Sequence, residues 1–213
     1  MNRNSATLII STIIFSLVYA IIRYHYFKEL DFSLFIFVIN KGVSLGSVLL
    51  LSFSYTVGPL ARNFPKVFMK FTSGKRLFGI TGFGLAFLHS IISLLIFEPE
   101  YFNRFFILEE LNIVGNFILI TGIISLILIG AAFITSFPRV FKFKPSFFSL
   151  SQRAGLIGLI FGGIHVLPIG INGWAQPNLW PGYLIPITLI SFIVVIFTIY
   201  CRTVLNSRNQ NVD

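Results

Sequence analysis

Long apolar runs separated by short polar segments dominate this chain. Six of the runs are about 17–25 residues long, the length at which an α-helix crosses a bilayer. They predict transmembrane helices at 6–24, 42–60, 77–97, 113–136, 154–171 and 183–201. We therefore expect an all-α polytopic membrane protein, whose single domain, residues 1–213, is a bundle of six transmembrane helices.

The start of the second helix is less sharply marked than the other helix ends. A start near Ser33 would place Asn40 and Lys41 within the bilayer, where charged side chains are costly. We therefore predict that this helix begins at Gly42 and that Lys41 lies at the membrane interface.

Composition agrees with a chain embedded in membrane lipid. Hydrophobic residues make up 55% of the 213 and charged residues 11%, and the mean hydropathy is +0.88. The net charge of +9 comes from basic residues in short loops between apolar runs, so no nucleic-acid partner is expected. The single cysteine, Cys201, excludes an internal disulfide and a cysteine-ligated metal cluster.

The basic residues also predict an orientation. Six spans place both termini on one side, and most Lys and Arg residues fall in segments on that side, chiefly 61–76 and 137–153. The loop at 98–112 is acidic instead. By the positive-inside tendency, both termini are expected to be cytoplasmic.

Two stretches, 76–89 and 152–165, share a stripe of small residues that ends in a histidine. The stripes, with steps of 3, 4 and 3, are Gly79, Gly82, Ala86 and His89 in the first stretch and Gly155, Gly158, Gly162 and His165 in the second. Residues at this spacing share one helix face and form a shallow groove, into which a flat ligand or another backbone can fit. Two such grooves would form a slot if they faced each other.

Both histidines are expected at one depth in the outer half of the membrane. His89 follows Arg76 by about 20 Å of helical rise, and His165 follows Arg153 by about 18 Å. Ionisable residues are rare inside a bilayer, and two imidazoles on opposing helices can ligate a heme iron from both faces. The pattern predicts a heme with His89 and His165 as its metal ligands. The small residues predicted beside it are Gly82, Ala86, Gly158 and Gly162.

Other interpretations of these residues stay open. A histidine in a membrane helix can be a hydrogen-bonded packing residue, and glycine stripes serve helix contacts more often than cofactors. Zinc is disfavoured, because two histidines fall short of the three or four ligands that it prefers. A cofactor-free scaffold or assembly factor and, less strongly, a transporter are the alternative functions.

Four stretches of the chain resemble the ferric-reductase-like transmembrane family, and especially its small bacterial heme-binding members that accompany a periplasmic methionine sulfoxide reductase. They are GVSLGSVLLLSFSYTVGPLARNF, KRLFGITGFGLAFLHSIISLL, LILIGAAFITS and SQRAGLIGLIFGGIHVL, all between Gly42 and Leu167. The resemblance implies a six-helix bundle in a bacterial inner membrane that binds b-type heme through His89 and His165. It implies electron transfer rather than a self-sufficient enzyme.

The chain departs from that family at one level of the bundle. Family members with two stacked hemes carry a second histidine nearer the cytoplasm on both helices, where this chain has Arg76 and Gln152. A guanidinium offers no lone pair, and an amide is a poor ligand. A single heme on the outer side is therefore expected, with a quinone, a flavin or a redox partner protein as electron donor.

Overall fold

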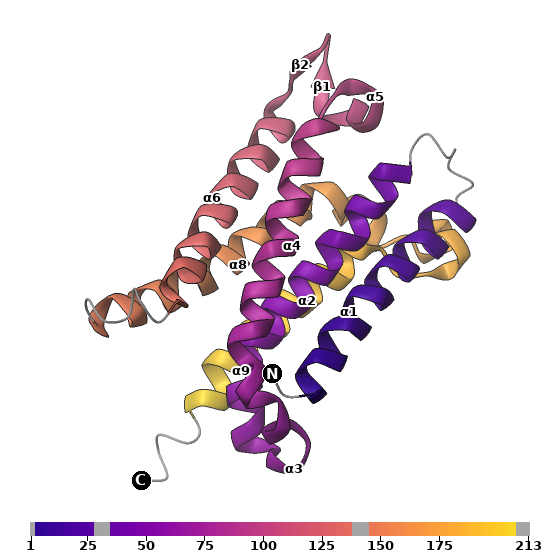
Figure 1. Cartoon of the computed structure of the whole chain (residues 1–213). Helices are drawn as coiled ribbons and strands as arrows, with labels where there is room; N and C mark the ends of the chain where they lie inside the picture. Colours follow the sequence, from indigo (N-terminus) through magenta and orange to yellow (C-terminus); the bar gives the residue numbers. More distant parts are fainter. Residues whose placement is uncertain (1–2, 28–34, 138–144, 208–213) are drawn as a thin grey trace.

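The computed structural model describes residues 3–27, 35–137 and 145–207, and these are almost entirely helical (Figure 1). Six helical segments are long and apolar enough to cross a membrane, so the chain is an all-α polytopic bundle, as the hydropathy pattern predicts. The long helices are α1 Arg3–Ile21, α2 Phe35–Asn63, α4 Lys75–Leu95, α6 Ile113–Thr135, α8 Pro145–Trp174 and α9 Ile187–Ser207.

Short elements join or extend the long helices. The π-helix η1, Ile22–Tyr26, continues α1, and η6, Pro181–Tyr183, occupies the predicted start of the last helix. The others are α3 Pro65–Phe68, η3 Met69–Gly74, α5 Pro99–Phe102, η4 Asn103–Phe105, η5 Pro177–Leu179 and an antiparallel hairpin of β1 Phe106–Ile107 with β2 Glu110–Leu111.

The second helix begins earlier than predicted. α2 starts at Phe35, so Asn40 and Lys41 lie inside it. Asn40 is buried and hydrogen-bonded, and the ammonium group of Lys41 lies 4.2 Å from the ring centroid of Phe37. The predicted start at Gly42 is wrong, because these partners stabilise both polar residues near the end of a membrane helix.

The fifth helix is also longer than its apolar run. α8 begins at Pro145, so Gln152 and Arg153 lie inside it. Proline is well tolerated in the first turn of a helix, where its missing N–H costs nothing. Three basic residues predicted for the preceding loop, Arg139, Lys142 and Lys144, lie outside the described residues.

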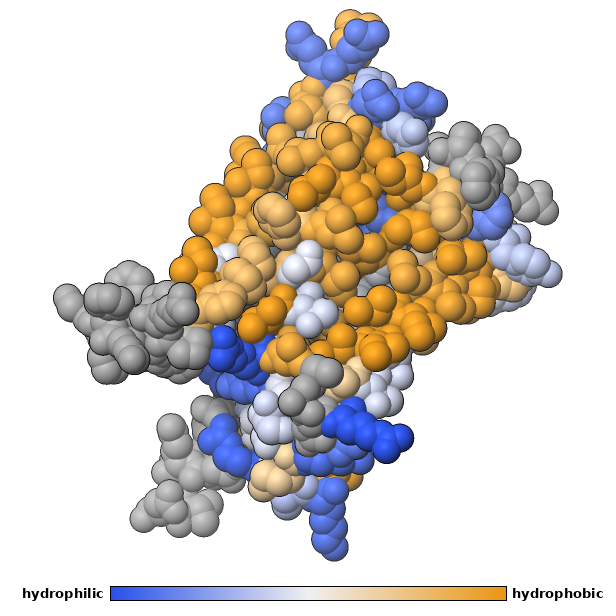
Figure 2. All heavy atoms as spheres, in the orientation of Figure 1, coloured by the Kyte–Doolittle hydropathy of each residue, from blue (hydrophilic) through white to orange (hydrophobic). Residues whose placement is uncertain are grey.

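Apolar side chains form a broad band around the middle of the molecule, and hydrophilic ones gather at its two ends (Figure 2). The end with α3, η3, the start of α1 and the end of α9 is called the basic end here (Figure 1). Its basic residues include Arg62, Lys66, Lys70, Lys75 and Arg76. The opposite, acidic end carries the β-hairpin and the residues Glu98, Glu100, Glu109 and Glu110.

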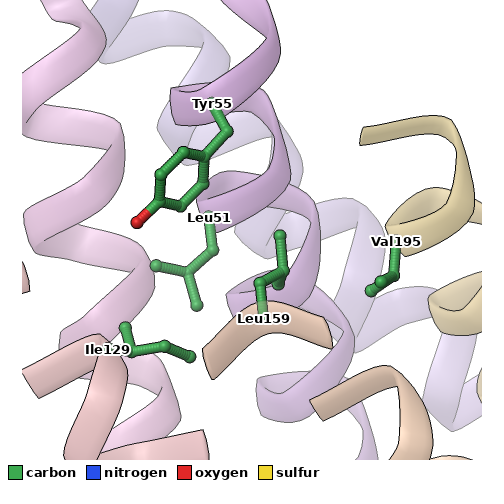
Figure 3. Packing of buried hydrophobic residues seen from close by; sticks show 5 residues of the cluster. All are labelled: Leu51, Tyr55, Ile129, Leu159 and Val195. Carbon is green, nitrogen blue, oxygen red and sulfur yellow. The ribbon is translucent and has the colours of Figure 1, made fainter. Parts of the chain in front are cut away.

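Four helices form two closely packed pairs. α2 packs along α4 and α6 packs along α8, whereas α4 contacts α6 much less. α1 and α9 pack against α2, which is the most buried of the membrane spans. An apolar cluster joins the two pairs and α9 (Figure 3); it consists of Leu51, Tyr55, Ile129, Leu159 and Val195. The two helices with the singled-out histidines, α4 and α8, therefore belong to different pairs.

Candidate functional site

The two helix pairs are built on the same contact. In the first pair, the hydroxyl of Ser47 in α2 donates to the carbonyl of Gly82 in α4 at 2.9 Å. In the second pair, the hydroxyl of Ser125 in α6 donates to the carbonyl of Gly158 in α8 at 2.7 Å. Each of these glycines precedes the histidine of its helix by seven residues. The pairs are therefore equivalent units, each of which presents one histidine.

A buried asparagine of α2 orients His89. The Nδ1 atom of His89 lies 2.8 Å from Oδ1 of Asn40, and Nδ2 of Asn40 donates to Oγ of Ser93 at 2.9 Å. Because an amide oxygen can only accept, Nδ1 of His89 carries the proton and donates it. The Nε2 atom of His89 therefore keeps its lone pair.

His165 is oriented in the same way by α6. Its Nδ1 donates to the backbone carbonyl of Ile118 at 2.8 Å, so its Nε2 also keeps a lone pair. Ile118 and Asn40 each lie seven residues before the serine that binds the glycine of their unit. The two acceptors thus occupy equivalent places, although one is a backbone group and the other a side chain.

A glycine of α6 makes room for the second imidazole. A Cβ atom on Gly122 would lie 3.1 Å from Nδ1 and 3.2 Å from Cε1 of His165. These separations are tighter than ordinary van der Waals contact, so a larger side chain would press against the ring. Gly122 therefore positions His165, a role that the sequence analysis missed.

Both histidines lie toward the acidic end of the bundle. His89 lies six residues before the end of α4 at Leu95, about 9 Å of helical rise. Ile118, which binds His165, lies five residues after the start of α6 at Ile113, about 8 Å of rise. The imidazoles are partly buried and close enough to each other to interact electrostatically. The two Nε2 lone pairs therefore belong to one region of the bundle.

The glycines of the two stripes pack against neighbouring helices. A Cβ atom on Gly82 would lie 2.9 Å from the backbone nitrogen of Leu51 in α2. A Cβ atom on Gly158 would lie 3.0 Å from the backbone nitrogen of Ile129 in α6. At these two positions the stripes therefore lie against α2 and α6 and do not form an open slot with each other.

The other predicted small residues also lie beside protein atoms. Ala86 packs against the apolar cluster of Figure 3, and a Cβ atom on Gly162 would lie 3.2 Å from Oγ of Ser125. Heme contact at Gly82, Ala86, Gly158 and Gly162 stays a prediction. At Gly82, Gly158 and Gly162, contacts with the protein explain on their own why the residues are small.

The packing role of Gly82 can be tested by adding one methyl group. We expect Gly82→Ala to lower the thermal unfolding midpoint of the heme-free protein in detergent, because the methyl group meets the backbone of α2. Overpacking of this kind costs about 1–3 kcal/mol. Gly84→Ala is the matched control on the same helix, since nothing lies within 4 Å of its Cβ position. Equal midpoints for the two variants would contradict the packing role.

The remaining residues that the sequence singled out make other contacts. His25, in η1, packs edge-on against the ring of Phe35, with 6.3 Å between the ring centroids. Arg76 and Gln152 both line a cavity of about 320 Å³ toward the basic end. Within the described part of the chain, no three side chains of His, Cys, Asp or Glu gather as they would around a zinc ion.

No protein-family model matches this chain, and no curated protein sequence matches it either. The resemblance to ferric-reductase-like proteins therefore stays a prediction from the quoted stretches. The two imidazoles and the groups that orient them are the features from which a function can be inferred.

Proposed function

We propose that this protein is a membrane b-type cytochrome, which passes single electrons from a quinol or flavin donor to an acceptor on the outer side of the membrane. One heme b would be held between α4 and α8 by Nε2 of His89 and Nε2 of His165. One observation carries the proposal: both imidazoles use Nδ1 as a hydrogen-bond donor to equivalent places in two equivalent helix pairs, which leaves both Nε2 atoms able to bind a metal.

The donor set fits a heme iron. Metal-bound histidines usually donate their second N–H to a fixed acceptor, which orients the ring and raises the basicity of the ligating nitrogen. Asn40 and the carbonyl of Ile118 do this for His89 and His165. When bound, the heme supplies a one-electron couple, and its two imidazole ligands leave no open position for oxygen or substrate.

The helix contacts support a fixed geometry at the two imidazoles. The bonds from Ser47 to Gly82 and from Ser125 to Gly158 resist rotation of α4 and α8 about their axes. Each bond lies about two helical turns from the histidine of its helix. Turning Nε2 away from its place would break the Nδ1 bond, which contributes about 1 kcal/mol net.

Charge supports the direction of electron flow that we propose. Positive residues favour the cytoplasmic side, so the basic end would face the cytoplasm of a bacterial inner membrane and both termini would lie there. The histidines would then lie nearer the outer face. Because Arg76 and Gln152 are unsuited to ligate a second heme, electrons would come from a quinol in the membrane or from a flavin-bearing redox partner.

Absorption spectra of the detergent-purified protein, oxidised and then reduced with dithionite, test this proposal. We expect the α, β and Soret bands of a low-spin b-type cytochrome and about one heme per chain. The heme-to-protein ratio is measured after expression with added heme precursor, so that supply does not limit loading. A monodisperse protein without heme under these conditions would contradict the proposal.

A cofactor-free scaffold is the second candidate, and one observation favours it. Both histidines already have an acceptor for Nδ1 within the protein. Gly82, Gly158 and Gly162 pack against neighbouring helices, as they would in a bundle without a cofactor. The heme-to-protein ratio separates the two candidates. A ratio near zero, with unfolding behaviour unchanged by added heme, would favour the scaffold.

A further inference from the structure

A cavity at the basic end of the bundle lies apart from the two histidines. It has a volume of about 320 Å³ and lies where α2, α4, α6 and α8 meet η3. The lining residues deeper in the bundle are apolar, among them Leu51, Phe83 and Ile129. Those nearer the basic end are polar, among them Ser54, Thr72, Ser136 and Gln152. The cavity is therefore amphipathic along its length.

Positive charge is concentrated at the polar end of this cavity. Lys75 and Arg76 line it, and the guanidinium of Arg76 lies 5.6 Å from the ring centroid of Phe137. Arg62 and Arg202 are close enough to Lys75 to interact with it electrostatically. Four cationic side chains from α2, α4 and α9 thus share one region.

The helices that line the cavity carry no acidic residue. Residues 32–97 contain no Asp or Glu, and neither do residues 111–212. All four helices that line the cavity fall within these two stretches. Lys75 and Arg76 therefore repel each other, with no acidic side chain on the lining helices to offset this, and an anion in the cavity would reduce the repulsion.

We propose that this cavity binds the phosphate group of an amphipathic anion. Lys75 and Arg76 would supply charge-assisted contacts to the phosphate oxygens, and neighbouring hydroxyl and amide groups would donate further hydrogen bonds. The apolar residues deeper in the cavity would contact the apolar part of the ligand. Basic pockets between membrane helices bind phosphate-bearing head groups in this way, and an anionic phospholipid and a soluble phosphate ester share this chemistry.

Native mass spectrometry of the detergent-purified chain tests the lipid source. The protein is first equilibrated with phosphatidylglycerol or with phosphatidylcholine, and bound lipid is counted per chain. We expect retention of phosphatidylglycerol but not of phosphatidylcholine, and a loss of retention by about tenfold or more in the double variant Lys75→Gln/Arg76→Gln. The control Lys66→Gln/Lys70→Gln removes the same charge from the preceding segment without touching the cavity, and should retain the lipid.

Titration with inorganic phosphate, followed by the thermal unfolding midpoint, tests the soluble source. Phosphate that stabilises the unchanged protein and the control, but not the cavity variant, would support the site and assign it to a soluble phosphate ester. If the cavity variant and the control match the unchanged protein in both experiments, the proposal is overturned.

The test is independent of the cytochrome proposal. Bound lipid per chain and the thermal unfolding midpoint are both measured on protein without heme. A negative result for one proposal therefore does not bear on the other. Both substituted side chains are exposed, so the variants should fold normally. If the double variant proves unstable, the single variant Lys75→Gln repeats the test. We expect it to lose less of the bound phosphatidylglycerol than the double variant.

Discussion

Replacing either His89 or His165 by alanine is expected to abolish heme binding, while the chain still inserts as a six-helix bundle. A b-type heme has no covalent link to the protein, so each imidazole contributes a large share of its retention. We expect the heme-to-protein ratio to fall by more than about tenfold in either variant, since even loss of a group that only orients a ligand costs 10–100-fold in affinity. The ratio is measured on equal amounts of monodisperse protein, together with the reduced-minus-oxidised spectrum.

His25→Ala is the matched control for these two variants. It removes the same side chain from η1, where His25 packs against the ring of Phe35. The control should keep both the heme and its spectrum. A low-spin bis-imidazole spectrum that survives in His89→Ala or His165→Ala would show that another pair of residues ligates the iron.

Hydropathy was sufficient to predict the six membrane spans, because a helix in lipid satisfies its own backbone hydrogen bonds and needs only an apolar surface. The helix ends were less predictable, because they depend on partners from other helices. Asn40 lies inside α2 since His89 and Ser93 bind its amide group, and neither partner is close to it in sequence. α8 likewise extends beyond its apolar run to Pro145.

The stripes show how far spacing alone can predict a site. Steps of 3 and 4 correctly place small residues on one helix face, but they say nothing about the element that covers this face. Gly82 and Gly158 meet α2 and α6, the neighbours that follow from the pairing of helices in the folded bundle. The sequence does contain a sign of this pairing. Ser47 follows the acceptor Asn40 by seven residues, and Ser125 follows the acceptor Ile118 by the same number.

Two residues that position His165 could not be found from side-chain chemistry. Ile118 acts through its backbone carbonyl, a group that every residue carries, so nothing in its side chain indicates the role. Gly122 acts through the absence of a side chain. Because glycine is common in the helices of membrane bundles, its presence in α6 gives no specific signal. Asn40 is different, because a polar residue so near an apolar run is a visible signal. Its importance was missed because the predicted helix began after it.

The equivalence of the two pairs also accounts for the different character of the two ends of the bundle. Arg76 precedes Gly82 by six residues and Gln152 precedes Gly158 by six, so the two occupy equivalent places toward the basic end. His89 and His165 occupy equivalent places toward the acidic end. One end thus presents two imidazoles, and the other a guanidinium and an amide beside a cavity. The same scaffold therefore offers metal ligands at one level and anion ligands at another.

The second large effect is expected at Asn40. Asn40→Leu removes the acceptor for Nδ1 of His89, so the ring loses both its fixed orientation and its fixed tautomer. We expect heme affinity to fall by about 10–100-fold in titrations of the heme-free protein. The midpoint potential of the retained heme should rise, because an imidazole without this hydrogen bond is less basic and stabilises ferric iron less. Leucine favours membrane insertion, so the bundle itself should persist.

Ser93→Ala separates this orienting role from general damage near the site. It removes the group that accepts from Nδ2 of Asn40, together with a longer 3.4 Å contact between Oγ of Ser93 and Nδ1 of His89. The 2.8 Å bond from His89 to Oδ1 of Asn40 stays in place. Heme affinity and potential should therefore change much less than in Asn40→Leu. If Asn40→Leu kept both the affinity and the potential of the unchanged protein, Asn40 would be a packing residue, and the fixed Nε2 lone pair of His89 would no longer support heme ligation.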